Sequence, residues 1–257
     1  MAEQQHPSAL YQPGVQLATD RHVPPEPFGR AYKNAESIRK PLRRNALALN
    51  KQAESHVLTI IGDLSQRRRG KTGGPRLLRC YMDSDQSVHY VAKIYDAIYY
   101  PLSDYEGLDC MYLADQSYSR EAAAYEVIPA NFQGAVVPKY FGSWTSLVEC
   151  SASPSAFRPV RMILLEFISG ETLQDMIFHA GAYPERDGSI DISEIDYQLL
   201  PPEPERLDVL ATVIETKSTG PWDVLVSHSS PRRIVLLDFQ TALVFRRCEW
   251  GHKFLER

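Results

Sequence analysis

The segment that most constrains the fold of this chain lies near its C-terminal end, at residues 221–243. Two apolar runs, at 224–226 and 234–237, flank a polar stretch that contains serines and a proline, and this order predicts an antiparallel hairpin. Asp223 precedes the first strand and Asp238 follows the second, so closing the hairpin should bring the two carboxylates together. Paired carboxylates suit a magnesium ion, although two solvated acids at strand ends would show the same spacing.

The composition is that of an ordinary globular protein. The chain has 257 residues, of which 44% are hydrophobic and 23% charged, enough for one two-lobed domain or two small ones. A net charge of −4 argues against a polyanion-binding protein as a whole. Basic residues gather at 39–44 and 67–71, where they could contact nucleic acid or form a nuclear address. Solvated loops are the simpler interpretation, so a nucleic-acid partner is not expected.

Cysteine spacing and the N-terminal sequence predict an intracellular protein. The four cysteines form no CxxC pair, and no histidine lies at ligand spacing from one, which argues against a zinc module. The N-terminus lacks the basic and then apolar pattern of a signal peptide, and no apolar run is long enough to cross a bilayer. We therefore expect a cytoplasmic or nuclear protein with reduced thiols and no membrane partner.

Three regions are expected along the chain. Residues 1–54 are polar and weakly periodic, which predicts a disordered or loosely attached arm. Residues 55–168 should form a sheet and a helix, and residues 169–257 a smaller helical part that ends in the hairpin. The expected strands are 56–64, 76–82, 88–95, 136–144 and 161–167. The expected helices are 119–128 capped by Ser119, the later part of 169–179, which starts with a turn and has Thr172 as its cap, and 205–217. Residues 101–116 look like an insertion, and residues 181–204 like an acidic, proline-bearing linker.

A Gly-Lys-Thr sequence at 70–72 invites comparison with a phosphate-binding P-loop. That motif needs a glycine where Ser65 stands, and it needs a helix to begin at once. The Gly-Gly-Pro sequence that follows prevents such a helix. We exclude a Walker-type site, which leaves a flexible basic loop over a phosphate group or a plain surface turn.

Lys93 lies inside the apolar sequence YVAKIY and needs a partner for its charge. Either its ammonium group reaches water, or it faces an acid. Glu121 on the following helix could be that partner. A glutamate near the start of a helix also interacts favourably with the helix dipole, which would explain Glu121 without any pairing.

These motifs resemble those of protein kinases. The sequence VAK ending at Lys93 resembles the strand whose lysine binds nucleotide phosphates, and Glu121 resembles the glutamate that pairs with that lysine. Residues 162–170 resemble the kinase hinge and its exit, and the sequence LDF around Asp238 resembles the metal-binding Asp-Phe motif. The matches stand in the right order from about residue 56 to 245, and this part of the sequence resembles the small kinase-like proteins of filamentous fungi.

The sequence departs from the kinase pattern at the catalytic loop. The asparagine position of that loop falls on Asp223, and the position of the base, five residues earlier, falls on Ser218. No His-x-Asp sequence occurs between residues 205 and 223, and Gln240 replaces the glycine that usually follows Asp-Phe. Little chain follows the hairpin, so most of the second lobe of a large kinase has no counterpart here.

The resemblance implies an α+β fold, namely a protein-kinase-like two-lobed domain with a truncated C-terminal lobe. It implies Lys93 on the phosphates of ATP, Glu121 orienting it, and Asp238 and Asp223 holding Mg²⁺. With Ser218 at the base position no catalytic residue is intact, so we expect a degenerate kinase-like protein, a pseudokinase, with weak or no nucleotide binding.

Three alternatives remain beside this interpretation. The first is a non-catalytic binding or scaffold protein on a kinase-like fold. The second is a nucleic-acid-associated protein that uses the two basic runs. The third is a working kinase whose gene model omits the catalytic-loop segment, because such an omission would give the same sequence.

Overall fold

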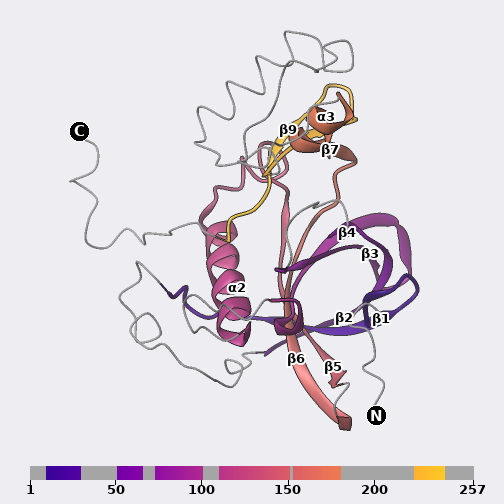
Figure 1. The fold of residues 1–257 in the computed structure, drawn as a ribbon, viewed down its shortest axis with the longest axis vertical. Coiled ribbons are helices and arrows are strands. Elements are labelled where there is room, and N and C mark those ends of the chain that lie inside the picture. The colour runs from indigo at the N-terminus through magenta and orange to yellow at the C-terminus, as the bar shows by residue number, and fades with distance from the viewer. Residues whose placement is uncertain are drawn as a thin grey trace, which may run out of the picture.

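The computed structural model of the protein describes residues 10–29, 51–65, 73–100, 110–150, 153–180 and 223–240. It contains a closed barrel of six strands, a long helix outside the barrel and a small three-stranded sheet, as Figure 1 shows. This combination confirms the α+β class. The predicted linker and helix between residues 181 and 217, Ser218 and both basic runs lie outside the described residues. No helix in the described part of the chain is long and apolar enough to cross a membrane.

The barrel is antiparallel throughout, with the strand order β1-β2-β3-β4-β6-β5. Its strands are β1 Gln16–His22, β2 Lys51–Asp63, β3 Arg76–Met82, β4 Asp85–Tyr95, β5 Tyr140–Cys150 and β6 Ser153–Glu166. β1 pairs with both β2 and β5 and thereby closes the sheet on itself. Closure gives each strand two neighbours over its paired residues, where the exposed edges of an open sheet are absent.

Alternation along the strands separates an apolar interior from an outer face that packs on the helix. Leu58, Leu78 and Met162 are fully buried in the interior cluster. Tyr95 and Ile163, from neighbouring strands, belong to a second buried cluster that includes side chains of the helix. The outer face of β4 and β6 is therefore the surface against which the helix is positioned.

The N-terminal region contributes a strand to the barrel. The prediction of a disordered or loose arm over residues 1–54 is wrong for residues 16–22, which form β1, and for residues 51–54, which begin β2. Thr19 and His22 are buried although they are polar, so the strand shows no apolar alternation that would reveal it.

Contacts with a buried aspartate fasten the start of this segment to the barrel. The Tyr11 hydroxyl donates to Oδ2 of Asp96, just beyond β4, over 2.7 Å, and Arg158 of β6 donates to the same oxygen over 2.8 Å. Burial and the neighbouring Asp96 both raise the pKa of Tyr11 well above its ordinary value. The phenol therefore stays protonated and able to donate.

Helix α2 spans Cys110–Val127 and so begins earlier than predicted. Ser119 lies in its middle, where its hydroxyl donates to the carbonyl oxygen of Gln116 over 3.1 Å, and the predicted cap is wrong. The buried face of α2 carries Asp115 and Glu121 among alanines and tyrosines, and Asp115 pairs with Arg161 of β6. Charged residues on the packed face remove the apolar period that marks a helix, and the predicted insertion at 101–116 is wrong for residues 110–116, which belong to α2.

Strands β5 and β6 form a hairpin whose strands extend into residues 145–160, between the predicted strands 136–144 and 161–167. Pro159 lies opposite Leu147 within it. β4 pairs with β6 only from Arg161 to Glu166, so the earlier residues of β6 have β5 as their partner strand. A proline can be accommodated in such a strand, because its missing N–H loses no hydrogen bond on a side that has no partner strand.

The smaller sheet consists of β7 Gly170–Thr172, β8 Val224–Ser227 and β9 Ile234–Leu236, and helix α3 Leu173–His179 follows β7. β8 and β9 form the predicted antiparallel hairpin. Thr172 caps α3 as predicted, because its Oγ1 accepts the N–H of Asp175 over 3.1 Å. At Gly170 any Cβ would clash with the carbonyl oxygen of Val226. The close approach of β7 and β8 therefore requires glycine there.

Candidate functional site

Lys93 of β4 and Glu121 of α2 form a buried ion pair. Nζ of Lys93 lies 2.7 Å from Oε1 and 2.6 Å from Oε2 of Glu121. The two side chains are 3% and 0% exposed, so neither charge is solvated. The predicted pairing of the strand lysine with the helix glutamate is thus present, and it compensates two charges that would be costly to bury alone.

Asp238 is the second acid on the same ammonium group. Lys93 donates to its Oδ1 over 3.1 Å. The chain that leaves β9 runs to α2 in Figure 1, where Phe239 stands edge-on to Tyr125 of the helix with ring centroids 5.3 Å apart. Asp238 has a φ of +80°, which aspartate tolerates better than most residues. Three elements far apart in the sequence therefore meet at one lysine; we refer to Lys93, Glu121 and Asp238 as the triad.

Tyr95 is a fourth member of the site, and the sequence reasoning missed it. Its hydroxyl donates to Oε2 of Glu121 over 2.6 Å. Complete burial, followed by repulsion from Glu121, raises the pKa of Tyr95 well above its ordinary value, so it remains a donor. Tyr95 stands two residues after Lys93 and thus on the same face of the strand. That alternation is the signal that could have identified it.

The electrostatics of the triad are dominated by burial. Burial raises the pKa of Glu121, Lys93 lowers it, Asp238 raises it again by repulsion, and the net direction is upward. One cation and two carboxylates would carry a net charge of −1 if all were ionised. A raised pKa at Glu121 means that a proton can relieve this excess negative charge as the pH falls.

Arg233 fastens the hairpin to the barrel. Its guanidinium donates to both carboxylate oxygens of Glu166, at the end of β6, over 2.7 and 3.2 Å. Burial acts to raise the pKa of Glu166, but the hydrogen bonds from Arg233 and from the backbone of Lys139 outweigh it, and the pKa is lowered. Leu236 also donates its N–H to the carbonyl oxygen of Val136 over 2.8 Å. These contacts hold β9 in place, and with it the following segment that brings Asp238 to Lys93.

Asp223 stands at the open end of the hairpin, as predicted. Its carbonyl oxygen accepts the N–H of Leu237 over 2.6 Å, which makes residue 223 a neighbour of the segment that carries Asp238. Oδ1 of Asp223 is buried. The hairpin therefore places the two acids at its open end.

The arrangement around Asp238 does not fit a bound magnesium ion. Oδ1 accepts hydrogen bonds from Lys93 and from the backbone N–H of Gln240, and Oδ2 accepts one from the side chain of Gln240. Magnesium requires oxygen ligands in near-octahedral geometry, whereas this carboxylate is surrounded by N–H donors. Within the described ranges, no three or more His, Cys, Asp or Glu side chains are grouped so as to hold a metal.

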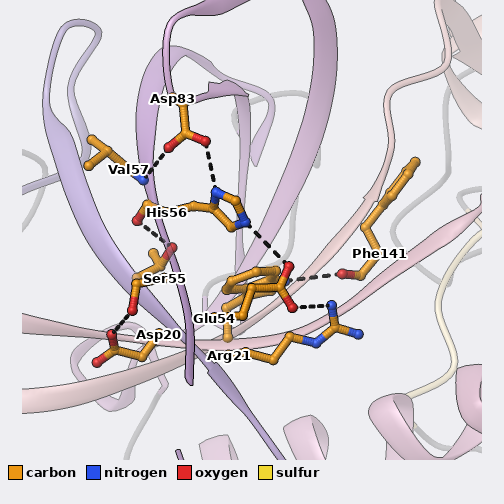
Figure 2. Close-up of polar contacts among 10 residues, drawn as sticks. Asp20, Arg21, Glu54, Ser55, His56, Val57, Asp83 and Phe141 are labelled. Atoms are coloured by element: carbon orange, nitrogen blue, oxygen red, sulfur yellow. Dashed lines mark hydrogen bonds and ion pairs between the residues drawn. The ribbon is translucent and has the colours of Figure 1, made fainter. Parts of the chain in front are cut away.

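A separate polar cluster surrounds His56 on β2, as Figure 2 shows. Its Nδ1 lies 2.7 Å from Oδ2 of Asp83 and its Nε2 lies 3.3 Å from Oε1 of Glu54. Glu54 also accepts from Arg21 of β1 over 3.1 Å, and the His56 ring stands edge-on to Trp144. Partial burial acts to lower the pKa of His56, but the two acids outweigh it and the pKa is raised. The cluster links β1, β2 and the turn between β3 and β4.

Comparison with known proteins gives a likeness in structure. No protein-family model matches the sequence, and no curated protein matches it. The PknI kinase domain of Mycobacterium tuberculosis aligns with 15% identity and a TM-score of 0.39, over 72% of this chain and 60% of that chain. A variant of that domain aligns with 13% identity, a TM-score of 0.40 and the same coverage. WbdD, crystallised with a kinase inhibitor, aligns with 17% identity and a TM-score of 0.32, over 71% of this chain and 40% of that chain. The chain therefore spans about 60% of the length of the PknI kinase domains with which it aligns.

Proposed function

We propose that this protein is a degenerate kinase-like protein that binds a nucleotide weakly through Lys93 and does not transfer phosphate. The observation that supports this proposal is the convergence of Lys93, Glu121 and Asp238 at one buried ammonium group. A strand lysine held by a helix glutamate is the arrangement with which protein kinases hold nucleotide phosphates. In this proposal the barrel and α2 act as the first lobe, and the small sheet with α3 as a shortened second lobe.

The hydrogen bonds of Lys93 explain why binding should be weak. An ammonium group has three N–H donors, and in the structure they serve Glu121 and Asp238. A phosphate oxygen would take the place of Asp238 and leave the pair with Glu121 intact. In this exchange one anionic acceptor replaces another on Lys93. Binding of phosphate therefore gains less free energy than it would at an ammonium group whose N–H had no acceptor.

The sequence at the base position supports the lack of transfer. Ser218 has a neutral hydroxyl that is too weakly basic to take the proton of an acceptor substrate. A positioned general base contributes about 10²- to 10⁴-fold to a rate. Loss of the loop that carries it would also remove substrate positioning, so ATP binding and phosphoryl transfer are separable in this protein.

A scaffold protein on the same fold is the second candidate. It is favoured by the fact that the hydrogen bonds described for Lys93 all lead to acids of the same chain. In that case the triad holds α2 and the hairpin on the barrel and binds no ligand. Nucleic-acid binding gains no support, because both basic runs lie outside the described residues.

Equilibrium dialysis with radiolabelled ATP distinguishes these functions. Wild type, Lys93→Ala, Lys93→Arg and the matched exposed-lysine control Lys139→Ala would each be checked for folding by circular dichroism. We expect weak saturable binding by wild type and Lys139→Ala, and loss of binding in Lys93→Ala. Absence of binding by wild type would favour the scaffold.

A phosphate-transfer assay with the same proteins tests the second half of the proposal. Radiolabelled ATP would be offered with a broad panel of peptides and small molecules. We expect background transfer in every sample. Robust transfer by wild type that Lys93→Ala abolishes would show a working kinase with a base elsewhere in the chain.

A further inference from the structure

Gln240 makes two contacts with Asp238 that the proposed nucleotide site does not require. Its backbone N–H donates to Oδ1 over 3.2 Å, and its side-chain Nε2 donates to Oδ2 over 3.2 Å. The amide group that faces a carboxylate must be the NH₂, because the carbonyl oxygen would be repelled. Together with Lys93, Gln240 surrounds both oxygens of Asp238 with donors.

A divalent cation and these donors compete for the same oxygens. Magnesium approaches a carboxylate oxygen to about 2.0–2.1 Å, and the hydrogen that the Gln240 side-chain amide donates to Oδ2 occupies that approach. On the other side, the ammonium group of Lys93 lies 3.1 Å from Oδ1 and repels a second cation for as long as no phosphate oxygen has replaced this contact. A cation could reach Asp238 only after the side chain of Gln240 had moved away.

We propose that Gln240 keeps divalent cations off Asp238, so that a nucleotide bound at Lys93 binds without a metal ion. The exclusion of the cation stands on the hydrogen bonds of Asp238 alone. Metal-free binding of a nucleotide at Lys93 rests in addition on the function proposed above. Gln240 is thus a specificity-determining residue: its side chain sets whether the site takes a bare nucleotide or a metal complex.

Manganese binding followed by electron paramagnetic resonance tests the exclusion in the full chain without nucleotide. Wild type and Gln86→Ala, the control at an exposed glutamine, should show no saturable binding. Gln240→Ala removes the Nε2 donor and should bind manganese saturably, at least about 10-fold more tightly than the weakest binding that the assay resolves, which is the smallest change that outer-shell groups of metal sites typically cause. Adding Asp238→Asn to Gln240→Ala should abolish that gain.

Two results would overturn the exclusion. Saturable manganese binding by wild type that Asp238→Asn removes would show that Gln240 does not protect the carboxylate. An affinity that is unchanged or lower in Gln240→Ala would show that its side chain is neutral or is itself a ligand. Both comparisons use proteins whose folding is verified by circular dichroism.

A second titration tests the consequence for the nucleotide. ATP would be titrated calorimetrically in EDTA and in magnesium, with wild type and Gln240→Ala. We expect equal affinity in both buffers for wild type and tighter binding in magnesium for Gln240→Ala. Magnesium-dependent binding by wild type would overturn the inference. If ATP binds neither protein in either buffer, the proposed function and metal-free nucleotide binding both fail, while the manganese result still decides the exclusion.

Discussion

Replacing Lys93 by methionine removes one charge from the triad and keeps a side chain of similar length. Glu121 is 0% exposed, and the hydroxyl of Tyr95 would remain as its hydrogen-bond donor. Removing one partner of a buried ion pair costs about 3–5 kcal/mol, because the other charge stays buried without compensation. At about 2–4 °C per kcal/mol for a chain of this size, the melting temperature should fall by about 6–20 °C.

The cost of Lys93→Met should depend on pH in a defined direction. Lys93 lowers the pKa of Glu121 against the effect of burial, so its removal raises that pKa further. The folded variant then binds a proton that the unfolded chain, with a glutamate pKa near about 4.3, releases. Stability of the variant therefore rises as the pH falls from neutrality, by up to about 1.4 kcal/mol per pH unit.

Urea unfolding followed by tryptophan fluorescence measures this cost, because Trp144 is buried in the barrel at 1% exposure. Wild type, Lys93→Met, Lys93→Met with Glu121→Leu, and the control Lys139→Met would be compared at about pH 6 and pH 8. The double variant should recover much of the loss, since an apolar pair can replace a buried ion pair. A cost below about 1 kcal/mol, as for exposed pairs, or a cost equal at both pH values, would refute this reasoning.

Three further perturbations test other parts of the fold. Asp96→Asn weakens the charged hydrogen bonds from Arg158 and should cost about 1.5–3 kcal/mol in urea unfolding; an unchanged midpoint would contradict it. Because the pKa of His56 is raised in the folded protein, its contribution to stability should be fully present below about pH 6.5 and lost as the pH rises through that raised pKa. Melting temperatures of His56→Gln that show the same pH dependence as wild type would disprove this. Gly170→Ala forces a clash with Val226 and should destabilise by about 1–3 kcal/mol, and an equal or higher melting temperature would exclude the close packing of β7 on β8.

The hairpin and the Lys93–Glu121 pair could be predicted because each follows from a local rule. The apolar runs on both sides of the turn have few ways to be buried other than by pairing, and they do pair. A lysine in an apolar strand needs an acid, and the next helix supplies one. The contact of Asp238 with the same lysine also fits the predicted order of motifs, although its distance of 145 residues along the chain has no local signal.

The parts that escaped prediction are those in which polar residues are buried. Thr19 and His22 are buried on β1, and Asp115 lies on the packed face of α2. Partners distant in the sequence compensate the cost of burying these polar side chains. The apolar period that marks a strand or helix is therefore absent at these positions. The contact between Gln240 and Asp238 depends on the backbone of the turn and likewise cannot be inferred from composition or spacing.

Labelling with a lysine-reactive acyl phosphate derivative of ATP, followed by peptide mass spectrometry, tests nucleotide binding at this site most directly. The reagent transfers its acyl group to a lysine that lies beside the bound phosphates. We expect acylation of Lys93 that excess ATP suppresses, with weak labelling of Lys139 that ATP does not change. Absence of label on Lys93, or label that is equal with and without excess ATP, would contradict a nucleotide site at the triad.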